Sequence, residues 1–174
     1  MINTIYIEDE ITDHPRTKKI IERFPSAIII SCTRYTEIFN RKSQNFRLQK
    51  KNPALILAKK HKGMVLPTPK HYGIGAKYNY YFSHMLNCIY DCRYCFLQGM
   101  FRSAHYILFV NYEDFMDEIN STLNKHASDN VHFFSGYDCD SLALDSVSNF
   151  ISDFLPFNKF QFCSTSSAEL NFFE

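Results

Sequence analysis

Three short apolar or aromatic runs predict strands in the second half of the chain, and two segments between them carry apolar residues at helical spacing. In the first of these helices, Phe115, Ile119 and Leu123 share one face, and Asn111 is placed to cap the N-terminus. The order strand, helix, strand, helix, strand makes two βαβ units, which predicts a parallel sheet with right-handed crossovers. The segments are residues 77–82, 111–125, 131–134, 141–155 and 160–163.

The first part of the chain carries a smaller set of α/β signals. Glycine and proline cluster between Gly63 and Gly75, which marks a loop and a domain boundary. We therefore predict an α/β fold in two parts, a small N-terminal α/β region over residues 1–76 and a second region over residues 77–174. In the first part we expect strands at residues 2–7 and 27–31, the second of them buried, helices at 14–24 and 35–40, and an apolar patch at 55–58.

Composition places the chain among globular proteins. It has 174 residues, of which 45% are hydrophobic and 21% charged, and this balance argues against intrinsic disorder. No apolar run approaches the roughly 20 residues of a membrane span, and the acidic start does not resemble a secretory signal peptide. We therefore expect a cytoplasmic protein without a membrane partner, in which thiols stay reduced. Six cysteines are then interpreted as ligands or reactive groups rather than disulfides.

The net charge of +1 conceals an uneven distribution along the chain. Residues 1–80 hold 15 Lys and Arg against 6 Asp and Glu, whereas residues 81–174 hold 4 against 12. The basic half predicts a surface for an anionic partner, foremost DNA, although a solvated basic face gives the same pattern. Its densest stretch has eight cations and no acid: Arg41, Lys42, Arg47, Lys50, Lys51, Lys59, Lys60 and Lys62.

Three cysteines directly after the first strand of the second part give the strongest chemical signal. Cys88, Cys92 and Cys95 form a C-x3-C-x2-C run. Structural zinc usually takes four ligands, and the fourth would have to come from His84 or His105. Three thiolates on one loop also suit a cubane iron–sulfur cluster that leaves one iron open to a cofactor. The position after a parallel strand, where α/β barrels keep their active sites, favours the cluster over a zinc loop.

The cysteine run, with Tyr94 before its last cysteine, resembles the signature of the radical S-adenosylmethionine enzymes. The surrounding sequence is similar to the spore photoproduct lyase family of DNA-repair enzymes, and the similarity extends over nearly the whole chain. This resemblance implies that the second part is the first half, with three parallel strands, of a radical S-adenosylmethionine partial barrel. The segments that carry it are residues 37–41, 55–59, 81–88, 95–98 and 141–145.

For the chemistry, the resemblance implies that the three cysteines hold a [4Fe–4S] cluster. In the superfamily the open iron binds S-adenosylmethionine, an external donor supplies one electron, and a 5′-deoxyadenosyl radical then abstracts hydrogen from the substrate. In the lyase family that substrate is a cross-linked thymine dimer in DNA. The resemblance also places Tyr94 at the adenine, as a candidate catalytic residue, and Ser135, Gly136 and Tyr137 at the methionine end of the cofactor.

Several positions depart from the lyase pattern. The lyase has a hydrogen-donating cysteine where this chain has Tyr137, so Cys139, two residues further on, is either the catalytic donor or a small buried residue. Phe96 replaces a second tyrosine beside the last cysteine and has no hydroxyl to pass a hydrogen. On the third strand, Ser164 stands at a cofactor-binding position within a triplet where relatives carry cations. These changes favour a substrate other than the spore lesion itself.

The number of strands is the last departure. Residues 77–174 hold three strands, whereas the radical enzymes use a six-stranded partial barrel. We therefore expect a truncated copy that does not turn over alone, because later strands help to close the pocket of a barrel. Whether the chain is an enzyme stays open. Two other functions fit the same sequence: a non-catalytic protein that binds an iron–sulfur cluster or zinc, and a basic nucleic-acid-binding module.

Overall fold

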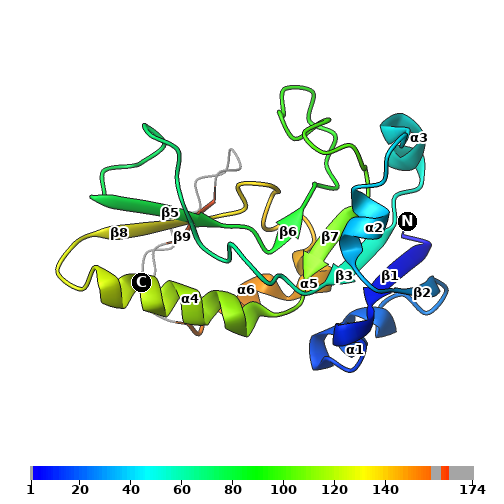
Figure 1. Cartoon of the computed structure of the whole chain (residues 1–174), viewed down its shortest axis with the longest axis horizontal. Coiled ribbons are helices and arrows are strands. Elements are labelled where there is room, and N and C mark those ends of the chain that lie inside the picture. The colour runs from blue at the N-terminus through cyan, green and yellow to red at the C-terminus, as the bar shows by residue number, and fades with distance from the viewer. Residues whose placement is uncertain (1, 158–161, 165–174) are drawn as a thin grey trace.

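Two mostly parallel sheets organise the computed structural model, which describes residues 2–157 and 162–164 (Figure 1). The larger sheet has the order β2-β1-β3-β7-β6 and the smaller one the order β4-β5-β8-β9. Of the described strands, β6 and β4 pair antiparallel with their neighbours and the others pair parallel. The strands are β1 (Thr4–Glu8), β2 (Ile28–Cys32), β3 (Leu55–Ala58), β4 (Leu66–Pro67), β5 (Tyr78–Phe82), β6 (Met85–Leu86), β7 (Tyr106–Phe109), β8 (Val131–Ser135) and β9 (Phe162–Ser164).

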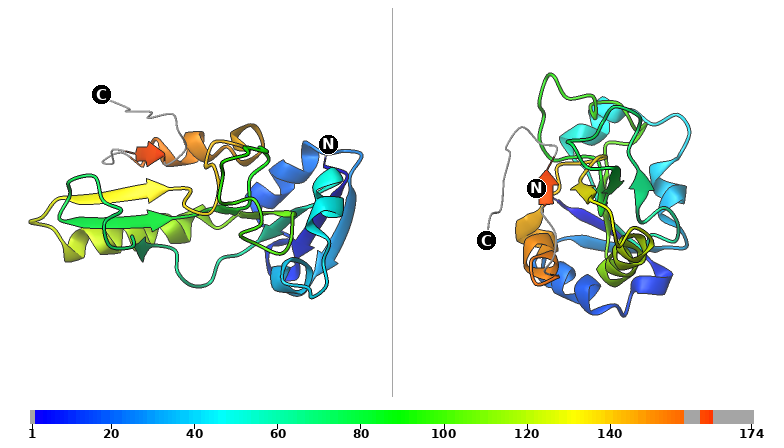
Figure 2. Two further views of the ribbon diagram at one scale, coloured as in Figure 1. Left: turned by 90° about the horizontal axis from the view of Figure 1, so that it is seen from above. Right: turned by 90° about the vertical axis from the view of Figure 1, so that its left-hand side faces the viewer.

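Helices cover one side of the smaller sheet. Figure 1 shows α4 below β5 and β8, and the view from above in Figure 2 shows these two strands in front of α4. The upper face of β5 and β8 is therefore not covered by any helix that the structure describes. Nor does any of the described helices have the length and apolar character of a membrane span. The helices are η1 (Asp9–Ile11), α1 (Pro15–Glu22), α2 (Tyr35–Phe39), α3 (Phe46–Lys51), α4 (Tyr112–Lys125), α5 (Asp145–Ser148) and α6 (Phe150–Phe154).

A common core joins the two sheets. Successive residues of a strand point to opposite faces, so Leu57 of β3 packs in one cluster with β1 and α1, while Ile56 packs in another. This second cluster also contains Phe109 of β7, Phe82 of β5 and Phe115 of α4, all of them buried. Apolar burial therefore holds the smaller sheet and α4 against the larger sheet.

The parallel sheet predicted for the second part is confirmed in β5, β8 and β9. The single helix predicted over residues 141–155 is wrong, because Asn149 has a φ of 52° and separates two short helices, α5 and α6. Asparagine tolerates this left-handed conformation better than most residues. A sequence pattern of apolar residues therefore predicted the right face but not the break in the backbone.

The prediction of a buried strand at residues 27–31 is confirmed for the strand and wrong for its burial. Strand β2 is present, but it forms an edge of the larger sheet, and Ile28, Ile29 and Ile30 are 65%, 43% and 39% exposed. An uninterrupted apolar run is typical of a parallel strand that is covered on both faces. Among the described residues, β2 has a neighbouring strand on one side only.

Strands β6 and β7 were not predicted, and both belong to the larger sheet. Strand β7 pairs with β3, and β6 pairs with β7, so this sheet contains strands from both sides of residue 76. The division of the chain into residues 1–76 and 77–174 stays a prediction. The two parts nevertheless share the larger sheet, because β3 of the first part pairs with β7 of the second.

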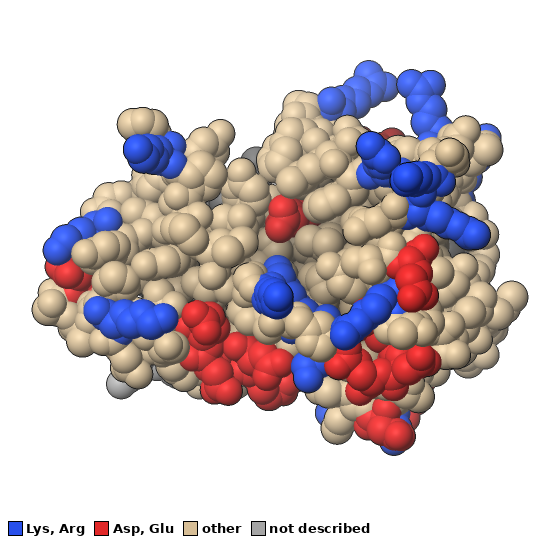
Figure 3. All heavy atoms as spheres, viewed as in Figure 1, with Lys and Arg blue, Asp and Glu red and all other residues tan. Residues whose placement is uncertain are grey.

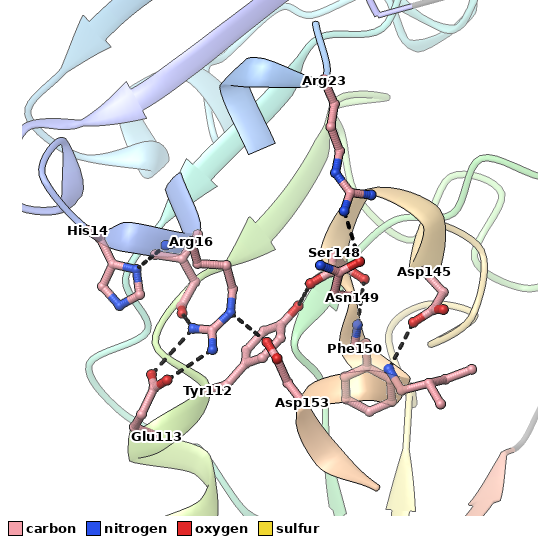
Figure 4. A network of polar contacts seen from close by, with 12 residues as sticks. His14, Arg16, Arg23, Tyr112, Glu113, Asp145, Ser148, Asn149, Phe150 and Asp153 are labelled. Carbon is pink, nitrogen blue, oxygen red and sulfur yellow. Dashed lines mark hydrogen bonds and ion pairs between the residues drawn. The ribbon is translucent and has the colours of Figure 1, made fainter. Parts of the chain in front are cut away.

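Arg16 of α1 adds a polar connection between the two parts of the chain (Figure 4). Its guanidinium lies 2.9 Å from carboxylate oxygens of both Glu113 and Asp153, and it also donates a hydrogen bond to the Val110 carbonyl. The same group stacks over the Tyr112 ring at 4.1 Å. The side chain is only 14% exposed, so these contacts compensate a largely buried charge. Helix α1 is thereby fixed to the start of α4 and to α6.

Candidate metal and cofactor site

The three cysteines lie on one long loop between β6 and β7, residues 87–105, which we call the cysteine loop. Its first residue, Asn87, is buried and has a φ of 65°. The Asn87 side-chain amide donates to the carbonyls of Ser103 and His105 at 2.7 and 2.8 Å, which ties the two ends of the loop together. The Asn87 backbone N–H donates to the Asp138 carbonyl at 3.1 Å. Asn87 thus fixes where the loop leaves the fold.

Cys88, Cys92 and Cys95 are all partly exposed free thiols. The backbone N–H of Cys95 donates to the Cys92 carbonyl at 3.0 Å, so these two residues share a tight turn. Burial raises the pKa of the Cys88 thiol, while the backbone N–H groups of Tyr90 and Asp140 donate to its sulfur and oppose that rise. Such N–H groups stabilise a thiolate, which is the form that binds a metal. The donor set is therefore three soft sulfur ligands on one loop.

The number and spacing of these sulfurs bear on which group they can hold. Sulfur ligands on a tetrahedral zinc, at about 2.3 Å from the metal, lie within about 4 Å of one another. In the described part of the chain, the three cysteine sulfurs do not all lie within 4.8 Å of one another. Three thiols leave a tetrahedral zinc one ligand short, whereas they are enough to attach a cubane cluster, so the number of sulfur donors suits the cluster better.

Helix α3 supports the cysteine loop from the basic half of the chain. The side-chain oxygen of Gln49 accepts the Ala104 backbone N–H at 2.9 Å. The Lys50 ammonium lies 3.4 Å from the Tyr90 carbonyl and 3.9 Å from the Asp91 carboxylate. The predicted basic stretch and the cysteines therefore belong to one surface, although they are about forty residues apart in the sequence.

The loop after β8, residues 136–144, meets the cysteine loop and is called the β8 turn. Gly136 has a φ of 78°, and a Cβ atom there would lie 2.7 Å from the Ser141 hydroxyl and 2.8 Å from the Cys139 carbonyl. Glycine is therefore needed by the turn itself, because no other residue fits without moving backbone. The hydroxyl of Ser135 is buried and hydrogen-bonded to that of Ser141 at 2.9 Å. The turn predicted at residues 135–137 is thus a crowded, closed one.

Cys139 is buried in the core next to the start of the cysteine loop. It is 4% exposed and packs in the cluster that contains Ile5, Leu57 and Leu144. Burial raises the pKa of its thiol well above the ordinary value, so the S–H form is retained. Burial fits the small buried residue, and a retained S–H fits a hydrogen donor, so both interpretations of Cys139 stay predictions.

Aromatic side chains gather where the cysteine loop and the β8 turn meet. The Tyr137 ring lies 4.5 Å from that of Tyr81 on β5 and 6.3 Å from that of Phe96. Phe96 is 64% exposed and Tyr94 83% exposed, so the ring of Tyr94 extends into solvent. Tyr137 and Phe96, the two positions that depart from the lyase pattern, are therefore neighbours, whereas Tyr94 does not join them.

For the third parallel strand, β9, the structure describes the backbone only. Ser164 of β9 pairs with Ser135 of β8, which places it at the same end of the sheet as the β8 turn. The side chain of Ser164, and residues 165 and 166 of its triplet, lie outside the described residues. The predicted role of Ser164 in cofactor binding stays a prediction.

Charge is unevenly spread over the surface that carries the site (Figure 3). Lys and Arg gather over α3 and the cysteine loop, at the upper right, while Asp and Glu gather along the lower edge. Lys60 is an exception within the predicted basic stretch. Its half-buried ammonium donates to the Ser83 carbonyl at 3.3 Å and lies 5.3 Å from the centre of the Phe109 ring, and burial lowers its pKa, which Asp138 opposes.

A second group of potential metal ligands is an ion-pair network. Oxygen and nitrogen atoms of Glu8, Glu10 and His61 lie within 4.8 Å of one another. The two oxygens of the buried Glu8 carboxylate already accept the backbone N–H groups of Tyr35 and Lys59. The Arg34 guanidinium lies 2.8 Å from Glu10 and supplies the positive charge that a metal would bring. We therefore assign no metal to this group.

Sequence reasoning missed Asn87, Gln49 and Tyr81. Asn87 and Gln49 act through contacts with residues 16 and 55 positions away, which local patterns do not reveal. Tyr81 had a signal, because the alternation along the strand predicted at residues 77–82 puts it on the face opposite to Tyr80 and Phe82.

Fold and site together define an α/β protein whose parallel sheet carries a three-thiol loop beyond its carboxyl end. The sequence model of the spore photoproduct lyase family matches residues 1–172, and the chain belongs to that family. The search of curated proteins found no match.

Solved structures of spore photoproduct lyase share the fold. A mutant with bound AdoMet and dinucleoside spore photoproduct superposes with a TM-score of 0.75 at 17% identity, over 94% of this chain and 48% of that chain. A tyrosine-to-phenylalanine mutant gives a TM-score of 0.73 at 18% identity with the same coverage of both chains. A complex with dinucleoside spore photoproduct also gives 0.73, at 17% identity and the same coverage. The chain thus spans about half the length of these lyase structures, and the predicted α/β fold is confirmed.

Proposed function

We propose that this chain binds a [4Fe–4S] cluster through Cys88, Cys92 and Cys95 and uses S-adenosylmethionine for radical chemistry on damaged DNA. The observation that carries the proposal is the way the cysteine loop is held. Asn87 closes its neck, Gln49 of α3 supports the same end of the loop at Ala104, and the β8 turn donates a backbone N–H to the Cys88 sulfur. The three cysteines are enough to attach a cubane cluster, so no further protein ligand is needed.

The residues present fit this cofactor by their donor chemistry. Cys88, Cys92 and Cys95 supply three soft sulfur ligands, the number that attaches a cubane cluster and one fewer than structural zinc usually takes. When bound, the cluster and S-adenosylmethionine supply the one-electron chemistry that no side chain offers. Backbone N–H groups around Cys88 stabilise the thiolate form, and the β8 turn gives the site a rigid floor.

The aromatic group beside the loop is suited to bind and shield a flat ligand. Tyr81, Tyr137 and Phe96 form a partly exposed surface next to the cysteines. Aromatic faces stack on nucleobases and exclude water from one side of them. Tyr137 and Phe96 lack the thiol and the phenol of the lyase pattern, so we infer a DNA lesion other than the thymine cross-link as substrate. Tyr94 and Cys139 stay candidates for hydrogen transfer.

Anaerobic reconstitution with iron and sulfide tests the cluster. The expected result is about four irons per chain, a cubane-type electron paramagnetic resonance signal after dithionite reduction, and a change in that signal on adding S-adenosylmethionine. Cys92→Ala should lose the iron. Cys32→Ala is the matched control, because Cys32 is a buried cysteine outside the loop, and it should keep the iron.

Two outcomes point to the other functions that fit the sequence. One zinc per chain and no stable iron would identify a zinc protein and overturn the proposal. A stable cluster whose signal ignores S-adenosylmethionine, with no 5′-deoxyadenosine formed under dithionite, would identify a non-catalytic iron–sulfur protein. Formation of 5′-deoxyadenosine by the 174-residue chain would instead support radical chemistry and contradict the expectation that it does not turn over alone.

A further inference from the structure

The segment between residues 38 and 90 contains ten Lys and Arg and no Asp or Glu. It includes α3 at one end of the molecule and, at the other, the loop that joins β4 to β5. We call this second loop, residues 68–77, the hairpin loop. Figure 1 shows it rising on the same side of the smaller sheet as the cysteine loop, opposite to α4. Two projections thus flank the face of β5 and β8 that the described helices leave uncovered.

The hairpin loop is firmly anchored at its base. The Thr68 backbone N–H donates to the Asn79 carbonyl at 3.0 Å, and the Asn79 side-chain amide donates to the Ala76 carbonyl at 2.9 Å. A Cβ atom on Gly73 would lie 2.6 Å from the Asn79 amide nitrogen, so the loop is folded directly onto this side chain. The Tyr72 backbone N–H closes a turn with the Pro69 carbonyl at 3.1 Å. The conformation of the loop is therefore set before any partner arrives.

The tip of this anchored loop carries apolar side chains into solvent. Tyr72 is 67% exposed and Ile74 59% exposed, and both stand outside the two core clusters of the described residues. Lys70 and His71 beside them are exposed as well, and neither has an ion pair within the described part of the chain. A stacking ring, an apolar wedge and the cation of Lys70 on one ordered loop are the groups that bind unstacked bases and their phosphates.

We propose that the hairpin loop is a nucleic-acid contact that recognises distorted or single-stranded DNA. Tyr72 stacks on an exposed base, Ile74 fills the space left between separated bases, and Lys70 contacts a phosphate. The inference rests on the proposed function only in taking DNA as the substrate class. It adds a second contact beyond α3, so that a DNA strand crosses the uncovered face of β5 and β8 and passes the aromatic group at the cysteine loop.

Fluorescence anisotropy of the full chain with labelled oligonucleotides tests this contact. The probes are a single strand, an intact duplex and the same duplex with a mismatched pair. Tyr72→Ala should weaken binding to the single strand and the mismatched duplex by about five-fold or more, while Tyr72→Phe, which keeps the ring, should stay within about two-fold of wild type. Ile28→Ala removes an equally exposed apolar side chain from β2 and should change nothing.

Salt dependence separates the phosphate contact from the stack. Lys70→Glu should lower the slope of log affinity against log salt by about 1 or more, whereas Lys19→Glu, a reversal on exposed α1, should leave it unchanged. Equal binding of all three probes by wild type and Tyr72→Ala overturns the inference, and so does an absence of DNA binding at low salt. Tyr72-dependent binding by a chain that takes up no iron would support the inference while the proposed radical function fails.

Discussion

The cysteine loop and the β8 turn meet at the same end of the smaller sheet, yet they are built in opposite ways. The β8 turn buries Cys139, Ser141 and Leu144 and closes so tightly that only glycine fits at its start. The cysteine loop is twice as long, leaves its thiols partly exposed and extends Tyr94 into solvent. The turn is therefore a closed, crowded support, whereas the loop is held at its neck and leaves its thiols accessible to a ligand.

Two glycines give the strongest test of this difference. Gly136 and Gly99 both have positive φ, but a Cβ on Gly136 would meet backbone under 3 Å, whereas nothing lies within 4 Å of one on Gly99. We expect Gly136→Ala to lower the free energy of unfolding by about 3–4 kcal/mol and Gly99→Ala by about 1 kcal/mol. Urea denaturation of the two variants measures this. Equal losses would mean that the turn is no more rigid than the loop.

Substitutions at Asn87, which closes the neck of the cysteine loop, should lower the free energy of unfolding almost as much as Gly136→Ala does. Asn87→Ala leaves the Ser103 and His105 carbonyls without their donor and puts alanine, which tolerates a left-handed backbone less well than asparagine, at a φ of 65°, for an expected loss of about 3 kcal/mol. Asn87→Gly tolerates the backbone conformation and should lose about 2 kcal/mol. If Asn87→Gly is as stable as wild type, the two hydrogen bonds do not hold the neck.

His84, at the base of the cysteine loop, gives a pH-dependent test. Its ring is fully buried against Phe150 at 4.0 Å, and neither ring nitrogen has a partner among the described residues. Burial lowers its pKa from 6.5 to about 3, so the folded state favours the neutral ring. The stability that this provides is complete above pH 6.5 and is lost as the pH falls towards about 3, with about 2 kcal/mol lost at pH 5.

His84→Leu should therefore lose less stability between pH 7 and pH 5 than wild type does. Thermal unfolding at several pH values is the measurement. His71→Asn, at an exposed histidine, is the control and should keep the wild-type pH dependence. A His84→Leu curve parallel to that of wild type would show that the ring is hydrated rather than buried.

The smallest expected effect is the difference in stability between replacing a core cysteine and replacing a loop cysteine, measured on protein that holds no cluster. Cys139→Ala removes a core side chain and should cost about 1–2 kcal/mol of unfolding free energy. Cys95→Ala, on the partly exposed loop, should cost less than about 0.5 kcal/mol. Circular dichroism during urea denaturation of both variants compares them. The reverse order would place the Cys139 thiol in the site rather than in the core.

The sequence was sufficient for what depends on neighbours along the chain. The spacing of Cys88, Cys92 and Cys95 and the apolar runs of β5 and β8 carry their information locally, so the thiol loop and the parallel pairing were predicted. Contacts between distant segments were not predicted, because no local pattern indicates which segments meet. Asn87 reaches Asp138 and Ser103, and Lys60 lies under Ser83, only through the fold.

Strand β2 shows the same limit, since an apolar run has the same pattern at the edge of a sheet as at its centre. Three consecutive exposed isoleucines on an edge strand offer both unpaired backbone groups and apolar side chains to other molecules. No lysine, proline or bulge interrupts them, and these are the usual protections of such an edge. We therefore expect this edge to govern colloidal behaviour in a concentrated preparation, so that Ile29→Lys raises the salt concentration and temperature at which the protein precipitates.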